Sequence, residues 1–325
     1  MATYKEIKGT GVRNFSSDPS NPLFGQIWYN TTSGTFKGQE NTPSTWASGG
    51  SLATERQDLG GAGIQTSALA FGGESPTTNN LTEEYDGSAW TGGGNLGTAR
   101  VALAGCGTLT AGLAFGGYDN PSPKTATNAT EEYDGTSWTG GGNMGTARYY
   151  LGGVGTQTAG LGFGGDGVPG ITDVTEEYDG SSWTAGGALG TGRKAVAGCG
   201  LQTAALAIGG SPGGSNETNA TEEYNGTAWT AGGNLATNIR YLAAAGTQTA
   251  GLAFGGLGDA IPTQTEEYDG SAWTISSGTL NTARLRLAGA GTQTAALAFG
   301  GNTGPGAVTE EYTGGGPVTV TLTSS

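Results

Sequence analysis

The residues best suited to acid–base chemistry in this sequence are paired carboxylates that recur six times. The triplet Glu-Glu-Tyr ends at Tyr85, Tyr133, Tyr178, Tyr224, Tyr268 and Tyr312. Two carboxylates can act as acid and base in hydrolysis when both face one bond. Adjacent residues of a strand point to opposite faces, however, so Glu83 and Glu84 do not form such a pair. An arginine recurs as well, at Arg56, Arg100, Arg148, Arg193 and Arg284. A Glu–Arg contact repeated in this way indicates architecture rather than a single active site.

Other common catalytic groups are missing from the sequence. The chain has no histidine, which excludes Ser-His-Asp and Cys-His nucleophiles and His-ligated zinc. Cys106 and Cys199 share a repeat column with small apolar residues, so we expect buried thiols too far apart for a disulfide. Asp119, Asn120 and Asp166 are weak calcium candidates, because no EF-hand-type loop surrounds them. The prediction is therefore no catalytic residue, no metal and no cofactor.

Charge and hydropathy narrow the range of partners. The 13 basic and 27 acidic residues give a net charge of −14, and the chain has no basic stripe to bind a phosphate backbone, so we expect no nucleic-acid partner. No apolar run is long enough to span a membrane, and the first ten residues lack the apolar core of a signal peptide. Residues 1–40 carry four basic and three acidic residues, whereas the rest is strongly acidic. Residues 1–40 are therefore predicted to be a separate segment.

The remaining chain is an internal repeat of 44 to 48 residues. A tryptophan marks each copy, at Trp46, Trp90, Trp138, Trp183, Trp229 and Trp273. One unit predicts four strands, over Arg100–Gly107, Thr110–Gly117, Ala129–Asp134 and Thr136–Gly140, with Asp-Gly as the tight turn between the last two. Many short strands at this period are typical of a β-propeller with one four-stranded blade per repeat.

The two ends of the repeat region complement each other. The last copy has its third strand, Val308–Tyr312, but no tryptophan strand after it, while an orphan tryptophan strand, Thr45–Ala47, precedes the first copy. We therefore expect an all-β fold in which residues 41–313 form six blades and the N-terminal strand completes the last blade. Residues 314–325 are either a free tail or an extra strand.

Two resemblances to known families follow from these motifs. The apolar run, Gly-Gly, tyrosine and tryptophan, with an arginine opening the first strand, resemble the kelch repeat over residues 44–313, although the third-to-fourth hairpin is shorter here. The segment Gly25–Gly38, GQIWYNTTSGTFKG, is predicted to be a hairpin and resembles an element of virion structural proteins of tailed bacteriophages. That second resemblance implies a place on a phage particle, such as a tail fibre.

The six copies disagree at two places, the loop between strands two and three and the pair of residues after the arginine column. Antiparallel topology puts both places on one face, where chemically diverse side chains on a uniform scaffold indicate a binding surface. The candidate ligand-binding residues are Gln57, Asp58, Tyr118, Asp119, Tyr149, Tyr150, Lys194, Arg240, Tyr241 and Arg286.

The predicted function is that of a non-enzymatic phage virion protein whose propeller binds a host-surface glycan or outer-membrane receptor. Residues 1–40, with Trp28 and Tyr29, would attach it to other virion proteins, and a second copy of the chain is a further candidate partner. The alternative is a capsid or tail decoration protein with a purely structural role. An enzyme that degrades polysaccharide is a third, weaker reading, because the carboxylates are repeated rather than clustered.

Overall fold

The chain is described by a computed structural model over residues 12–20, 22, 25–121, 124–167, 169–214, 216–259, 262–302 and 306–322. It divides into two compact units, Met1–Ser44 with Gly314–Ser325, and Thr45–Thr313. The fold is all-β, and none of the residues just given lies in a helix. Accordingly, the described part of the chain contains no helix that could cross a membrane.

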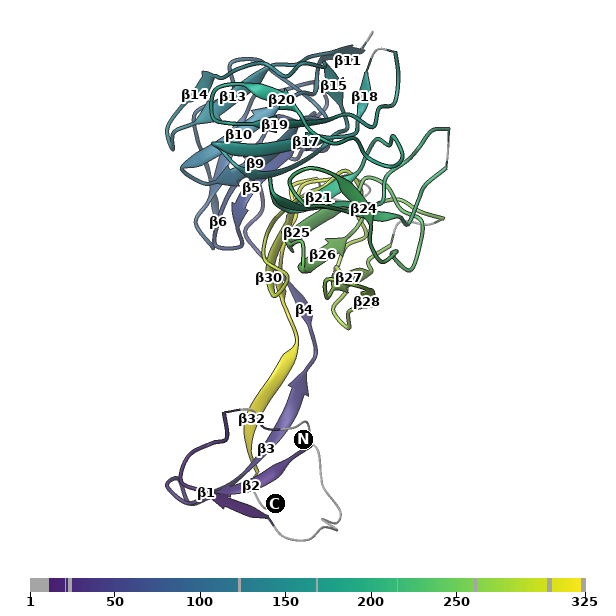
Figure 1. Ribbon diagram of the computed structural model, residues 1–325. Helices are drawn as coiled ribbons and strands as arrows, with labels where there is room; N and C mark the ends of the chain where they lie inside the picture. Colours follow the sequence, from purple (N-terminus) through teal and green to yellow (C-terminus); the bar gives the residue numbers. More distant parts are fainter. Residues whose placement is uncertain are drawn as a thin grey trace. The chain divides into compact units, whose positions relative to one another are not determined.

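The smaller unit is a four-stranded sheet in the order β1-β2-β3-β32. β2 (Ile27–Asn30) and β3 (Thr35–Thr42) form the predicted antiparallel hairpin, and β1 (Arg13–Phe15) runs parallel to β2. β32 (Gly316–Leu322) pairs antiparallel with β3 along seven residues, and the two strands run side by side in Figure 1. Gly316–Leu322, within the segment that the sequence left open between tail and strand, therefore belong to this sheet.

The larger unit contains six four-stranded antiparallel sheets and is propeller-like. The first strands are β5 (Gly60–Ile64), β9 (Ala104–Thr108), β16 (Gly152–Thr156), β21 (Ala197–Leu201), β25 (Ala243–Thr247) and β29 (Ala288–Gly291). The second strands are β6 (Ser67–Phe71), β10 (Ala111–Phe115), β17 (Ala159–Phe163), β22 (Ala204–Ile208), β26 (Ala250–Phe254) and β30 (Ala295–Phe299). Each second strand is a short apolar run that is buried almost throughout, as the sequence predicts.

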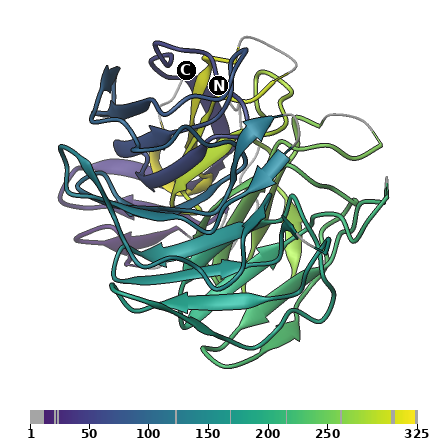
Figure 2. The same cartoon turned by 90° about the horizontal axis from the view of Figure 1, so that it is seen from above.

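The Glu-Glu-Tyr and tryptophan segments supply the outer half of each sheet. The third strands are β7 (Thr82–Tyr85), β13 (Thr130–Tyr133), β19 (Thr175–Tyr178), β23 (Thr221–Tyr224), β27 (Thr265–Tyr268) and β31 (Thr309–Thr313). The fourth strands are β8 (Trp90–Gly92), β14 (Trp138–Gly140), β20 (Trp183–Ala185), β24 (Trp229–Ala231), β28 (Trp273–Ile275) and β4 (Thr45–Ser48). β4 comes first of these strands along the chain, yet it pairs antiparallel with β31, the third strand of the last sheet. In Figure 2 the colours pass through the sheets in chain order, and β29 of the last sheet contacts β5 of the first.

Two details of the predicted strands are wrong. The first strand of the second repeat begins at Ala104 rather than Arg100, because the intervening residues leave the sheet to make other contacts. The turn after Tyr133 is a four-residue loop rather than a two-residue Asp-Gly turn, since Tyr133 pairs with Trp138. In this loop the side chain of Asp134 accepts hydrogen bonds from the backbone of the second and third residues after it, both at 2.8 Å. The aspartate thus shapes the loop as an Asx turn.

The paired glutamates face opposite sides of their sheets, as predicted. Glu83 is buried and accepts a hydrogen bond from Arg56 at 2.8 Å, and this arginine also donates to two backbone carbonyls of its own sheet. Glu84 instead accepts a hydrogen bond from the hydroxyl of Tyr133 in the next sheet. The Glu–Arg contact recurs in five of the six sheets and the tyrosine–glutamate contact in all six, so the repeated carboxylates hold the sheets together.

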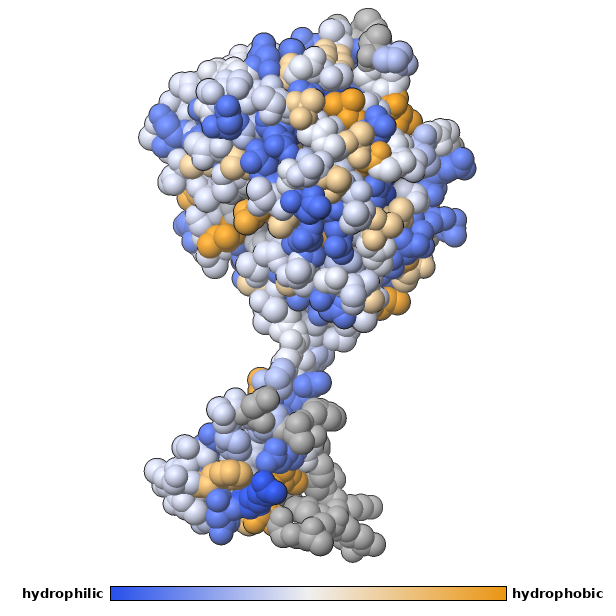
Figure 3. Space-filling view, viewed as in Figure 1, coloured by the Kyte–Doolittle hydropathy of each residue, from blue (hydrophilic) through white to orange (hydrophobic). Residues whose placement is uncertain are grey.

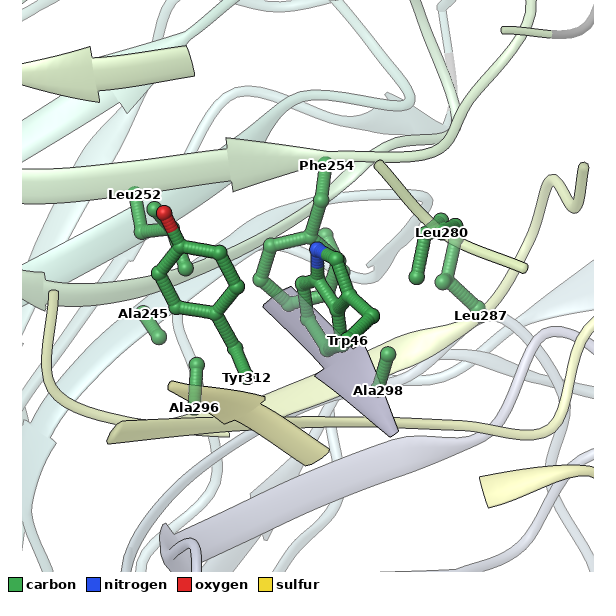
Figure 4. Close-up of a cluster of buried hydrophobic side chains, with 10 residues drawn as sticks. Trp46, Ala245, Leu252, Phe254, Leu280, Leu287, Ala296, Ala298 and Tyr312 are labelled. Carbon is green, nitrogen blue, oxygen red and sulfur yellow. The ribbon is translucent and has the colours of Figure 1, made fainter. Parts of the chain in front are cut away.

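Tryptophan packing joins neighbouring sheets. Each tryptophan of a fourth strand donates its indole N–H to a threonine hydroxyl of the adjacent sheet at 2.9 Å. Figure 4 shows one such junction, where Trp46 of β4 lies against Phe254 and Tyr312, with ring centroids 5.0 Å from each. Tertiary packing therefore fixes β4, a strand of only four residues, in its sheet.

One sheet lacks the buried arginine. Ile239 occupies the arginine column of the fifth repeat, and Glu266 there receives hydrogen bonds from Gln264 at 2.9 Å and from the backbone of Ala236 at 3.0 Å instead. Burial raises the pKa of Glu266 above its usual range. A cavity of about 10 Å³ lies beside it. Gln264 thus takes the place of the arginine as the side-chain partner of this glutamate.

Both cysteines are buried, as predicted, and neither forms a disulfide. Cys106 and Cys199 lie in first strands β9 and β21, where neighbouring sheets carry alanine or valine. Burial raises the pKa of both thiols to about 12. A thiol with such a pKa is almost entirely protonated at neutral pH and is a poor nucleophile.

Candidate ligand-binding site

Six residues form a hydrogen-bonded cycle just before the first strands, and we call them the ring site. Its members are Asp58, Ala102, Tyr150, Ala195, Tyr241 and Arg286. Each backbone N–H donates to the carbonyl of the preceding member, at 2.8 to 3.0 Å, and the N–H of Asp58 donates to Arg286. All six have positive φ, between 51° and 59°, and no other non-glycine residue of the described chain does. Such a backbone costs about 1 kcal/mol or more per residue, so the surrounding structure must hold it in place.

The residue before each ring-site member pairs with the first residue of a variable loop. Gln57 bridges to Glu74, Tyr149 to Asp166, and the other four repeats make the equivalent bridge. This pairing brings the two variable places of the sequence onto one face, as predicted from topology. A hollow of about 300 Å³ opens on the same face. Its lining includes Gln57, Glu74 and Pro76.

The ring site carries a charged and aromatic cluster. Asp58 accepts hydrogen bonds from Arg286 at 3.1 Å and from the hydroxyl of Tyr150 at 3.2 Å. The guanidinium of Arg286 also lies over the ring of Tyr241, 4.8 Å from its centroid, and Tyr241 packs edge-on against Tyr150 with centroids 5.2 Å apart. These side chains line a hollow of about 100 Å³ with residues from all six sheets.

Burial dominates the electrostatics of this cluster. Asp58 is 7% exposed, and desolvation raises its pKa to about 6 although Arg286 acts in the opposite direction. Desolvation also raises the pKa of Tyr150 well above its usual range, and the charge of Asp58 adds to that rise. Burial lowers the pKa of Arg286, but Asp58 and the neighbouring tyrosines outweigh it and raise the pKa overall. At neutral pH the site therefore holds an ion pair beside the neutral phenol of Tyr150.

The other predicted residues lie around the ring site with partners of their own. Lys194 forms an ion pair with Asp166 at 2.6 Å, and Arg240 forms one with Glu217 at 3.1 Å. Gln57 donates to the carboxylate of Glu74 at 2.9 Å. Asp119 is exposed on the hairpin of β11 (Tyr118–Pro121) and β12 (Lys124–Ala126).

Tyr118, Tyr149 and Tyr150, which the sequence placed on one face, come together as three contacting rings. The ring centroid of Tyr149 lies 5.3 Å from that of Tyr118 and 5.4 Å from that of Tyr150, and the centroids of Tyr118 and Tyr150 lie 6.4 Å apart. Sequence reasoning missed Lys124, an exposed residue whose Nζ lies over all three rings. Its place in a variable loop that starts with Tyr118 was the signal available in the sequence.

Of the two predicted attachment residues, one is inaccessible. Trp28 is fully buried, and its indole N–H donates to Asp18 at 3.1 Å. Tyr29 is half-buried against Phe36, with ring centroids 5.1 Å apart. Phe36 itself is 47% exposed. Trp28 thus belongs to the interior of this unit, and an external contact has to use the partly exposed Tyr29 and Phe36.

No metal centre occurs among the described residues, and the face drawn in Figure 3 shows no broad apolar patch. No group of three His, Cys, Asp or Glu residues within the described ranges could hold a metal ion. On the face drawn in Figure 3, hydrophobic residues of the larger unit are scattered among hydrophilic and neutral ones. The ring site and the loops around it are therefore the strongest candidate for binding.

Comparison with known proteins gives the fold and leaves the function open. No protein-family model matches the chain, and no curated protein does. The solved structure of a protein named YjhT is similar, with a TM-score of 0.67 at 14% identity over 81% of this chain and 95% of that one. At this identity the likeness extends to the fold alone.

Proposed function

We propose that Thr45–Thr313 is a closed, six-bladed propeller of the kelch type whose ring site binds a host-surface glycan or outer-membrane receptor. Three observations support closure. β4 completes the sheet that contains β29, β29 contacts β5, and the hydrogen bonds of the ring site pass through all six sheets and return to the first. A closed ring leaves few sheet edges exposed, which suits a protein that projects into solvent.

The observation that carries the binding function is the chemical diversity of the ring site on a repeated scaffold. The buried Glu–Arg pair recurs in five of the six sheets, yet the six ring-site positions hold aspartate, alanine, tyrosine and arginine. Aromatic faces pack on sugar rings, and the Asp58–Arg286 pair offers both an acceptor and donors to hydroxyl groups. A hollow of about 100 Å³ takes the end of a glycan rather than a long stretch of it.

A non-enzymatic role follows from the same residues. Asp58 has a pKa near 6, which suits a general acid or base. Glycoside hydrolysis needs two carboxyl groups at the scissile bond, however, and Asp58 is the only acidic member of the ring site. Its carboxylate already faces Arg286 and Tyr150. Binding therefore explains the arrangement better than hydrolysis does.

The virion role rests on the smaller unit. Its β2–β3 hairpin contains the segment that resembles virion proteins, and the exposed ring of Phe36 beside Tyr29 offers an apolar contact for another virion protein. Weak binding at each ring site would become strong attachment when many copies sit on one particle. If the variable face were covered by another virion protein, the decoration role would replace receptor binding.

Binding of the full chain to host cells and to an array of their surface glycans tests this function. We expect saturable binding that falls at least tenfold in the double variant Tyr241→Ala, Arg286→Ala. The matched control is the double variant Ile64→Ala, Leu201→Ala. It removes two exposed side chains, each at the end of a first strand that lies away from the ring site. Equal loss in both double variants, or no binding by the folded wild-type protein, would overturn the proposal.

A further inference from the structure

Three tyrosines beside the ring site face one positive charge. The Nζ atom of Lys124 lies 4.7 Å from the ring centroid of Tyr118, 5.4 Å from that of Tyr149 and 5.1 Å from that of Tyr150. A cation within about 6 Å of an aromatic centroid is attracted by the ring quadrupole. The ring plane of Tyr118 meets that of Tyr149 at 83° and that of Tyr150 at 70°, and the planes of Tyr149 and Tyr150 meet at 64°. The three rings therefore form three walls of a cage.

The backbone holds these walls in place without the lysine. Tyr118 exchanges two backbone hydrogen bonds with Val101, at 2.9 and 3.0 Å. Tyr149 pairs with Asp166 in the short ladder of β15 (Arg148–Tyr149) and β18 (Asp166–Gly167), and Tyr150 is a member of the ring site. Because each ring is anchored through its own strand or cycle, the cage is preorganised, and removing Lys124 should leave it intact.

The three tyrosines of the cage occur together only where the second and third copies of the repeat meet. The column of Tyr118 holds Glu74, Asp166, Ser211, Leu257 and Asn302 in the other five copies, and only the third copy has two adjacent tyrosines after its arginine. Architecture shared by all the sheets therefore does not require these rings. The hydroxyl of Tyr150 donates to the buried carboxylate of Asp58, which is itself paired with Arg286, and this hydrogen bond fixes the ring of Tyr150.

We infer that Tyr118, Tyr149 and Tyr150 form a binding site for an organic ammonium group, which Lys124 occupies in the free protein. A trimethylammonium group fits this site best, since it keeps the charge but is more weakly hydrated than the lysine ammonium. Lys124 lies on the exposed strand β12, so it can leave the cage without unfolding a sheet. This inference goes beyond the proposed glycan binding and needs only the cage.

Titration of the full chain with tetramethylammonium, followed by NMR, tests the site. The wild-type protein should bind this cation weakly, and Lys124→Ala should bind it about three- to tenfold more tightly, because the internal competitor is gone. In the Lys124→Ala background, Tyr149→Leu should weaken binding about two- to fivefold, whereas Tyr149→Phe should change it less than twofold, because phenylalanine keeps the aromatic face. Thermal unfolding of each variant checks that the fold is intact.

A neutral probe of the same shape distinguishes a cation-binding site from a pocket that binds any apolar group. Neopentane-like 3,3-dimethyl-1-butanol should not displace the ammonium at equal concentration. Equal binding of the neutral probe, or no ammonium binding by folded Lys124→Ala, would overturn the inference. Because this assay uses neither cells nor glycans, its failure is separate from a failure of receptor binding, which depends on Tyr241 and Arg286.

Discussion

Replacing Asp58 by asparagine should stabilise the protein at alkaline pH. Folding raises the pKa of this carboxyl from 3.8 to about 6, chiefly because burial disfavours its charge. Each pKa unit corresponds to 1.36 kcal/mol, so the ionised carboxylate costs about 3 kcal/mol of folding free energy at pH 8. The stability that the protonated carboxyl gives is fully present below pH 4 and is lost as the pH rises through 6. Asparagine stays neutral and tolerates positive φ, which is 51° here.

Urea unfolding of both proteins, followed by tryptophan fluorescence, measures this effect. The sequence pI near 4.3 makes pH 5 a practical lower limit, and about 1.4 kcal/mol of the advantage of Asp58→Asn should develop between pH 5 and pH 8. Asp134→Asn is the control without a pH trend: hydrogen bonds lower the pKa of this exposed carboxyl to about 2, so it is ionised in the folded and unfolded states alike from pH 5 to pH 8. An advantage of Asp58→Asn that shrinks as the pH rises would refute the electrostatic reasoning.

Further predictions concern the repeated contacts and are checked by the same unfolding assay. Glu131→Gln should cost about 3 kcal/mol, because it leaves a buried arginine without its carboxylate, whereas Glu266→Gln should cost less than about 1 kcal/mol; similar costs would contradict this account of the ion pairs. Ala102→Gly and Ala195→Gly should each raise the free energy of unfolding by up to about 1 kcal/mol, and a loss in both would show that the positive φ is unstrained. Gln157→Leu should cost about 1–2 kcal/mol by removing two hydrogen bonds to carbonyl groups of the neighbouring sheet, and an unchanged midpoint would argue that water replaces the side chain.

The repeat made much of the fold predictable. The Glu-Glu-Tyr and tryptophan columns predict the third and fourth strands, and the alternation of a strand correctly separates Glu83 from Glu84. Pairing between strands that are distant in the sequence was harder to predict. The hydrogen bonds of β32 to β3 join residues about 280 positions apart, and no local pattern marks which strand accepts such a partner.

The site was predictable in position but not in geometry. Comparison of the copies picks out Asp58, Tyr150 and Arg286 as variable, and the structure brings these three into contact. The positive φ of these residues leaves no signal in the sequence, because glycine, which usually marks that conformation, occupies none of the six positions. Lys124 was missed for a related reason, since its contact with Tyr149 crosses between two repeats.

A crystal structure of the full chain with the glycan that binds most tightly on a host-surface array tests the central proposal most directly. The account predicts that the terminal sugar lies in the hollow of the ring site, with hydrogen bonds to Asp58 or Arg286 and a ring face against Tyr241. A sugar bound elsewhere, such as beside Ile64 and Leu201 at the other end of the first strands, would contradict it.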